Sequence, residues 1–163
     1  MTLLPFLSAP LPVQVHIIAA ILALALGPVA LYRRKRDHTH KVVGYTWVTA
    51  MTVLAVGSFL IPSHFTSIGI GPLHGFAVLT LWSLWTGIKA AIAQDIARHE
   101  AVLRSLYSNG LIIAGAFTFL PGRTMNQMLF GEPSQLGWVV IAAFFGLVAL
   151  RVFLPRLGQW GWA

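Results

Sequence analysis

The sequence contains no cysteine and only four Asp and Glu residues. Without cysteine the chain can form no disulfide, no thiolate metal site and no covalently attached c-type haem. With so few carboxylates, acid–base hydrolysis is not expected. Charged residues of both signs make up 9% of the chain, against roughly 25% in soluble domains. The scarcity of charge therefore argues against a water-soluble globular protein.

Motifs of soluble enzymes are also missing. The sequence has no phosphate-cradling glycine loop, no dinucleotide fingerprint, no HExxH helix and no nucleophile elbow. The glycine-rich stretch GIGPLHG leads into a long apolar segment instead of following a strand. No catalytic residue is predicted, and whether the chain is an enzyme stays open at this point.

The chain does have long apolar stretches. Hydrophobic residues make up 57% of it, and the mean hydropathy is +0.78. A helix needs about 20 mostly apolar residues to cross the bilayer core. Five stretches meet this length, namely residues 13–32, 42–61, 72–94, 102–120 and 136–154. We therefore predict an all-α integral membrane bundle of five transmembrane helices, forming a single membrane domain over residues 1–163.

The basic residues fall in short bursts between these stretches, although the net charge of +7 could suggest nucleic acid. Nucleic-acid binders spread basic residues along one face among stacking aromatics, so no nucleic-acid partner is expected. Five alternating spans put ten of the eleven Lys and Arg residues on one side: Arg33, Arg34, Lys35, Arg36, Lys41, Lys89, Arg98, Arg104, Arg151 and Arg156. The positive-inside rule places this side in the cytoplasm, with the N-terminus outside and the C-terminus cytoplasmic. The same residues favour contact with anionic lipid at the cytoplasmic face of the bilayer. No Lys or Arg precedes Arg33, so a removable signal peptide is not expected.

Four histidines form two pairs at matched depth. His16 and His74 lie about one helical turn inside the first and third spans from the outer face. His40 and His99 precede the second and fourth spans on the cytoplasmic side. Imidazole can ligate haem iron, donate to a quinone carbonyl or relay protons. All four are therefore candidate binding residues for b-type haem or quinone, and candidate haem-iron ligands.

Each of these histidines also has a structural interpretation. A histidine at the water interface costs little, so His38, His40, His64 and His99 can be solvated or contact phospholipid. His16 and His74 lie deeper, where a hydrogen-bonded structural role is the alternative to a functional one. No zinc site is expected, because no third ligand is near in the sequence.

Arg123 is the one basic residue expected on the outer side. It offers a fixed positive charge for a carboxylate, a haem propionate or a lipid phosphate. The alternative is a surface arginine that extends its side chain to the lipid headgroups.

These residues belong to motifs with a family resemblance. The motifs are LGPVALYRRK, HKVVGYTWV, GSFLI, PLHGF and RHEAVLRSLYSNGLIIAGAFTFLPGR. They resemble, over about residues 14 to 130, a small bacterial family of predicted membrane proteins described only as a domain of unknown function. The resemblance implies a multi-pass helical bundle in a bacterial inner membrane and supplies no activity. Lys41 and Glu100 stand where the family pattern has arginine, which weakens the inner basic cluster.

Two functional hypotheses follow. The first is a small redox-associated membrane protein that binds b-type haem or quinone through the two histidine pairs, with Arg123 neutralising a propionate or an anionic substrate. The second is a non-catalytic accessory or assembly subunit that docks against a larger membrane complex through helix faces of small residues. A transporter is less well supported, since five spans give no even inverted repeat.

Overall fold

The computed structural model describes residues 2–33, 37–62, 69, 71–131 and 135–157, and all regular structure in these ranges is helical. The chain divides into two compact units. We call Ala9–Ala114 the bundle unit, and Met1–Ser8 together with Gly115–Ala163 the terminal unit. The single membrane domain expected from the sequence stays a prediction.

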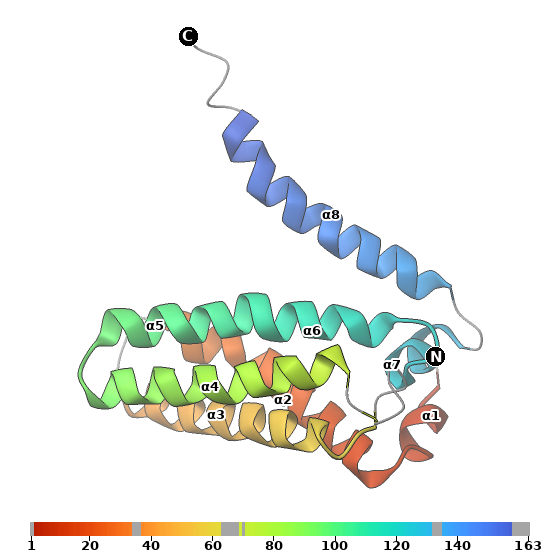
Figure 1. Cartoon of the computed structure of the whole chain (residues 1–163), viewed down its shortest axis with the longest axis horizontal. Coiled ribbons are helices and arrows are strands. Elements are labelled where there is room, and N and C mark those ends of the chain that lie inside the picture. Colours follow the sequence, from red (N-terminus) through yellow and green to blue (C-terminus); the bar gives the residue numbers. More distant parts are fainter. Residues whose placement is uncertain (1, 34–36, 63–68, 70, 132–134, 158–163) are drawn as a thin grey trace. The chain divides into compact units, whose positions relative to one another are not determined.

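The bundle unit consists of antiparallel helices that pack in chain order. Helix α2 packs most extensively against α3, α3 packs against α4, and α4 packs against α5 (Figure 1). A π-helical turn, η1, continues α5, and α6 crosses the boundary between the two units. The bounds of these elements are α2 Leu11–Tyr32, α3 His38–Ser58, α4 Pro72–Ile92, α5 Ile96–Ser105, η1 Leu106–Leu111 and α6 Ile112–Ala116.

Two aspartates begin helices at one end of this bundle. The Asp37 side chain accepts a hydrogen bond from the His40 backbone N–H at 3.0 Å, at the start of α3. The Asp95 side chain does the same for the Arg98 backbone N–H at 3.1 Å, at the start of α5. Each satisfies an N–H that the first helical turn would leave without a partner. We call this the connection end, because α2 and α4 end there and α3 and α5 begin there.

The core of the bundle unit is built from one tryptophan together with leucine, alanine and methionine side chains. Trp47 is 1% exposed, and its indole N–H donates to the carbonyl of Ala23 at 3.0 Å. Gly87 allows Leu103 of α5 to lie directly against α4, because a Cβ at Gly87 would overlap the leucine side chain. Small residues at such contacts let helix backbones approach closely. The buried cluster comprises Ala23, Ala30, Leu31, Trp47, Ala50, Met51, Leu84, Leu103, Leu106 and Leu111.

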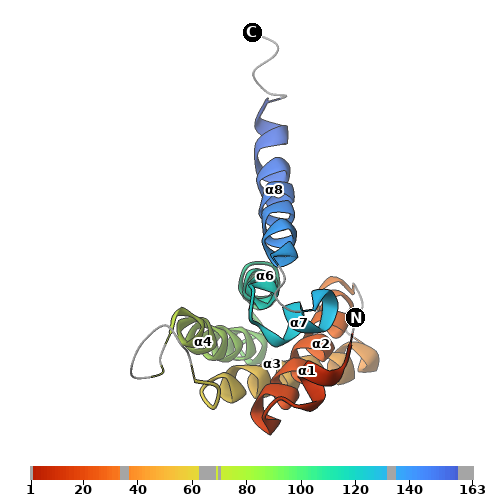
Figure 2. The same ribbon diagram turned by 90° about the vertical axis from the view of Figure 1, so that its right-hand side faces the viewer.

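The terminal unit brings the first residues of the chain against a segment near its end. Helix α1 packs beside α7 (Figure 2), and the backbone N–H of Thr2 donates to the carbonyl of Met128 at 3.0 Å. Asn126 is fully buried and donates its amide to the carbonyl of Phe119 at 2.7 Å. The elements of this unit are α1 Leu4–Leu7, the 3₁₀ turn η2 Phe117–Phe119, α7 Thr124–Phe130 and α8 Leu136–Leu157.

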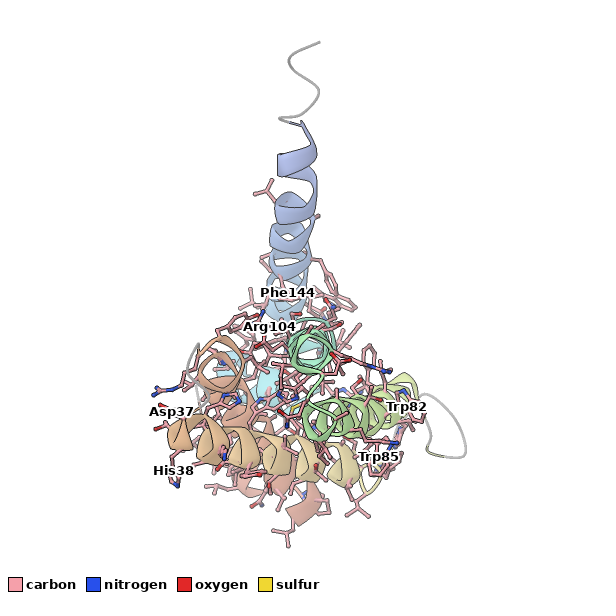
Figure 3. The ribbon with its side chains drawn as sticks, turned by 90° about the vertical axis from the view of Figure 1, so that its left-hand side faces the viewer. Asp37, His38, Trp82, Trp85, Arg104 and Phe144 are labelled. Atoms are coloured by element: carbon pink, nitrogen blue, oxygen red, sulfur yellow. The ribbon has the colours of Figure 1, made fainter. Side chains whose placement is uncertain are left out.

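Two of the described helices are long and apolar enough to cross a membrane. These are α2 and the segment Leu73–Ile92 of α4, and a shorter apolar stretch covers Leu136–Gly146 in α8. Trp82 and Trp85 project outward from α4 (Figure 3) and are 68% and 60% exposed. Large apolar side chains on a helix surface are suited to lipid. The structure thus supports membrane-crossing helices, whereas the number of five spans and their orientation stay predictions.

Candidate functional site

A pocket of about 240 Å³ lies at the connection end of the bundle unit. The end of α2, the first turn of α3, the end of α4 and the start of α5 form its walls. Its lining residues are Ala30, Leu31, Arg33, His40, Lys41, Ala91, Gln94, Ile96, His99, Glu100 and Leu103. Both histidines predicted as the inner pair line it, and we call it the His40–His99 pocket.

His99 is held in one orientation by the backbone of α4. Its Nδ1 lies 2.9 Å from the carbonyl oxygen of Gly87. A carbonyl oxygen only accepts hydrogen bonds, so the hydrogen of a neutral His99 ring belongs on Nδ1. The other ring nitrogen, Nε2, then carries a lone pair that can accept a hydrogen bond or bind a metal ion.

His40 has hydrogen-bonding capacity that its surroundings do not fill. Its Nδ1 is buried and has no hydrogen-bond partner among the described residues. A buried polar atom without a partner costs about 1–3 kcal/mol. Such an atom in the wall of a pocket indicates a place where a ligand could supply the missing bond.

The charged groups around the pocket are largely paired with one another. Arg33 and Asp37 form an ion pair with an N–O distance of 2.6 Å, and Arg104 and Glu100 form another at 3.2 Å. The hydrogen bond from the Arg33 guanidinium, followed by that from the His40 backbone N–H, lowers the pKa of Asp37 to about 2. Asp37 is therefore an anion over the whole physiological range. Lys41 adds an exposed positive charge at the rim of the pocket.

The predicted outer pair, His16 and His74, has a different arrangement, in which each histidine forms hydrogen bonds with different groups. His16 Nδ1 lies 3.1 Å from the Leu54 carbonyl and 3.4 Å from the Ser58 hydroxyl, which ties α2 to α3. His74 Nδ1 accepts a hydrogen bond from the Gly71 backbone N–H at 3.1 Å and so caps its own helix. No interaction found between described residues joins His16 to His74.

The remaining sequence-predicted residues are not among the lining residues of the pocket or lie outside the described ranges. His38 is exposed on α3 and points away from the bundle (Figure 3). Arg123 belongs to the terminal unit, where it immediately precedes α7. Arg34, Lys35, Arg36 and His64 lie outside the residues that the structure describes.

Sequence analysis did not identify the structural role of Tyr107. Pro28 has no N–H, so the carbonyl of Leu24 lacks its usual partner one turn along α2. The Tyr107 hydroxyl, from η1, donates to this carbonyl at 3.1 Å. Gly27 provides the space, because a Cβ there would overlap the tyrosine ring. The available signals in the sequence were Pro28 within an apolar stretch and Tyr107 in the motif RHEAVLRSLYSNGLIIAGAFTFLPGR.

Arg104 is a second residue whose structural role the sequence did not indicate. Its Nε donates to the carbonyl of Leu31 at 3.2 Å, in the last turn of α2. Its guanidinium also lies over the ring of Tyr32, 5.5 Å from the ring centre. Arg104 therefore joins α5 to the end of α2 and holds two walls of the pocket together.

A larger hollow of about 600 Å³ lies between α4 and the α5–η1 stretch. We call it the α4–η1 groove. Its surface is mainly apolar, but it contains the side chains of Ser83, Thr86, Ser105 and Asn109. The Asn109 amide donates to the Ser105 hydroxyl at 3.1 Å. The sequence did not predict this groove, because it depends on the π-helical turn.

The fold and these features define an all-α protein with helices suited to the membrane and a polar pocket at one end of a helical bundle. The chain belongs to the family described as Predicted membrane protein (DUF2306), whose model matches residues 13–157. The family resemblance predicted from the motifs is thereby confirmed, and the family has no established function. No curated protein and no solved structure matches the chain.

Proposed function

We propose that the protein spans a bacterial inner membrane five times, with its N-terminus outside, and binds a quinone in the His40–His99 pocket. The five spans would be α2, α3, α4, the stretch from α5 to η2, and α8. Support for the orientation comes from the basic residues, ten of which then face the cytoplasm. The pocket would lie at the cytoplasmic face, within reach of both lipid and water.

One observation carries the assignment of a ligand. Two imidazoles from distant parts of the chain line a single pocket, and one of them has a buried nitrogen without a partner among the described residues. Leu31, Ile96 and Leu103 add apolar wall to the same pocket. A ring that carries two oxygens matches this combination of apolar surface and a few polar groups.

The size of the pocket favours a quinone over b-type haem. Its volume of about 240 Å³ is below the roughly 300–1,000 Å³ typical of sites for drug-sized ligands. It therefore suits a quinone head group of one or two fused rings better than a porphyrin.

The outer pair is also less suited to haem than to a structural role. His74 accepts a hydrogen bond at Nδ1, so the hydrogen of its neutral ring belongs on Nε2. Iron ligation through Nε2 would require the ring to give up this cap. Haem at His16 and His74, with Arg123 against a propionate, is retained as the alternative outcome of the experiment.

Binding of menadione, a naphthoquinone without a lipid tail, tests the proposal. Purified protein in lipid nanodiscs is compared with H40F and H99F, which remove the imidazoles and keep an aromatic ring. Each lost hydrogen bond to a buried group is worth about 1–3 kcal/mol, so we expect affinity to fall roughly 5-fold to 100-fold. H38F is the matched control, because His38 lies on the same helix and is exposed.

Two results would contradict quinone binding in this pocket. They are no binding of menadione to the unmodified protein, and binding by H40F and H99F as tight as that by the unmodified protein. A Soret absorption band in protein from haem-replete cells that depends on His16 and His74 would support the haem hypothesis for the outer pair.

The α4–η1 groove favours a second candidate function, that of an accessory subunit. Helices in membranes associate through small and hydroxyl-bearing residues, and the groove offers Ser83, Thr86 and Ser105 with Gly110 beside them. Purification in mild detergent tests this candidate. A stoichiometric partner protein that is lost in S83L and T86L, and retained in T46L on the exposed surface of α3, would support it. A chain that purifies alone in native and variant forms would argue against it.

A further inference from the structure

The hydrogen-bond partner of His99 restricts which groups a ligand can present to the pocket. The Gly87 carbonyl is part of the α4 backbone and can only accept a hydrogen bond. A side-chain amide, by contrast, can rotate to present either its oxygen as an acceptor or its NH₂ group as a donor. With the Nδ1 hydrogen of His99 committed to this oxygen at 2.9 Å, the Nε2 of the neutral ring has only a lone pair to offer. The ligand atom that meets Nε2 must therefore donate a hydrogen bond.

The two redox forms of a quinone differ in this property. The oxidised form carries two carbonyl oxygens, which only accept hydrogen bonds. The reduced form, a quinol, carries two hydroxyl groups, each of which can donate one. A carbonyl placed against the Nε2 lone pair of His99 would leave both atoms without a bond, and unmade bonds of buried polar groups are costly.

From this geometry we infer that the His40–His99 pocket selects a quinol over the corresponding quinone, with His99 accepting one quinol hydroxyl. The inference rests on the proposed function and adds the redox form of the ligand. His40 offers the second hydrogen-bonding position through its unpartnered Nδ1. Among the described residues no backbone carbonyl bonds to that nitrogen, so the His40 ring can take either tautomer. His99, and not His40, therefore determines the preference for quinol over quinone.

The other polar groups of the pocket do not oppose this selectivity. Arg33 is engaged by Asp37, and Glu100 is engaged by Arg104. The side-chain amide of Gln94 donates to the carbonyl of Ala91 at 3.4 Å. Lys41 could donate to a quinone carbonyl, but it is an exposed residue at the rim, where water competes for its ammonium group.

The inference is tested by the ratio of the affinities for menadiol and menadione, measured in lipid nanodiscs. Menadiol and menadione are titrated under anaerobic conditions into the protein, H99Q and the control H38Q. We expect menadiol to bind at least tenfold more tightly than menadione to the native protein and to H38Q. In H99Q the ratio should fall towards one, because a glutamine amide can rotate to donate or accept.

The outcomes separate the inference from the proposed function. Equal affinities for menadiol and menadione in the native protein would overturn the selectivity and leave quinone binding intact. No binding of either compound would overturn both.

Nitrogen-15 NMR of the histidine rings gives a second test that needs no variant. The inference requires a neutral His99 ring with its hydrogen on Nδ1 and, on addition of menadiol, a shift of the unprotonated Nε2 signal towards the hydrogen-bonded range. A hydrogen on Nε2 in the ligand-free protein would overturn the inference.

Discussion

His38 and His40 are separated by one residue at the start of α3 and have different surroundings. Residues two apart on an α-helix lie about 200° apart around its axis. His38 is consequently exposed and points away from the bundle, whereas His40 lines the pocket. From the sequence, His40 was a candidate binding residue and His38 was not, and only His40 lines the pocket. A chemical role for His40 stays a prediction.

The ion pair of Asp37 with Arg33 predicts an unusual titration. The pKa of Asp37 is lowered from 3.8 to about 2, so its stabilising effect is complete above pH 3.8 and is lost as the pH falls towards 2. Carbon-13 NMR of the side-chain carboxyl should show a midpoint near 2. In R33Q the midpoint should return towards 3.8, while R98Q, which changes a basic residue near the other helix cap, should leave it unchanged. A midpoint near 3.8 in the native protein would rule out a persistent ion pair.

At the scale of helices, the proline inside α2 and the π-helical turn η1 are joined by a hydrogen bond. Pro28 frees a carbonyl in α2, and the π-helical turn brings the Tyr107 hydroxyl to it. π-helical turns within α-helices are often found near functional sites. Here the turn also places Asn109 in the α4–η1 groove. The residue from η1 therefore satisfies a bonding requirement that Pro28 creates in α2.

Substitutions at this contact should destabilise the bundle unit in a coupled way. Y107F removes one hydrogen bond, worth about 1 kcal/mol, while G27A forces a methyl group against the Tyr107 ring at about 1–3 kcal/mol. The matched control is G44A, because nothing lies within 4 Å of a Cβ at Gly44. Alanine favours a helix over glycine by about 0.5–1 kcal/mol, so G44A should be neutral or stabilising. Thermal unfolding followed by circular dichroism in mild detergent measures all three.

The double variant completes this test. If the ring of Tyr107 is what opposes G27A, G27A/Y107A should be more stable than the sum of the two single effects predicts. Strict additivity of G27A and Y107A would mean that the close contact does not determine the cost.

Helix positions were largely predictable from the sequence, and the details of the candidate site were not. Long apolar stretches located α2, α3, α4 and α8 to within a few residues, because a helix of that length has few alternatives. The short helices α1 and α7 and the π-helical turn were missed, since four to seven residues carry too little periodic signal. Depth along the helices suggested two histidine pairs. It could not show that backbone groups of Leu54, Gly71 and Gly87 already bond three of these rings.

At the scale of the whole molecule, the membrane topology depends on helices of mixed polarity. Within the described part of the chain, only α2 and the α4 segment satisfy the length and apolarity expected of a span. Helix α3 begins with two histidines and a lysine, and α5 contains Arg98, Glu100 and Arg104. These charged residues all lie at or near the connection end, where the proposed orientation places them at the cytoplasmic interface. A span can carry charges there at low cost, because long side chains reach the headgroups.

Reporter fusions distinguish five spans from two. In the five-span arrangement with the N-terminus outside, a phosphatase fused after position 37 is cytoplasmic and inactive, after position 68 active, and after positions 94 and 163 inactive. If only α2 and α4 crossed the membrane, with the same orientation of α2, the fusion after 68 would be inactive and that after 94 active. The two arrangements therefore predict opposite activities after positions 68 and 94.

A fluorescent protein that folds only in the cytoplasm, fused at the same four positions, should give the complementary pattern. Activity after 94 together with fluorescence after 68 would rule out the crossing of α3. It would also place the end of α2 and the start of α5 on opposite sides of the bilayer, which the hydrogen bond from Arg104 of α5 to the carbonyl of Leu31 in α2 does not allow.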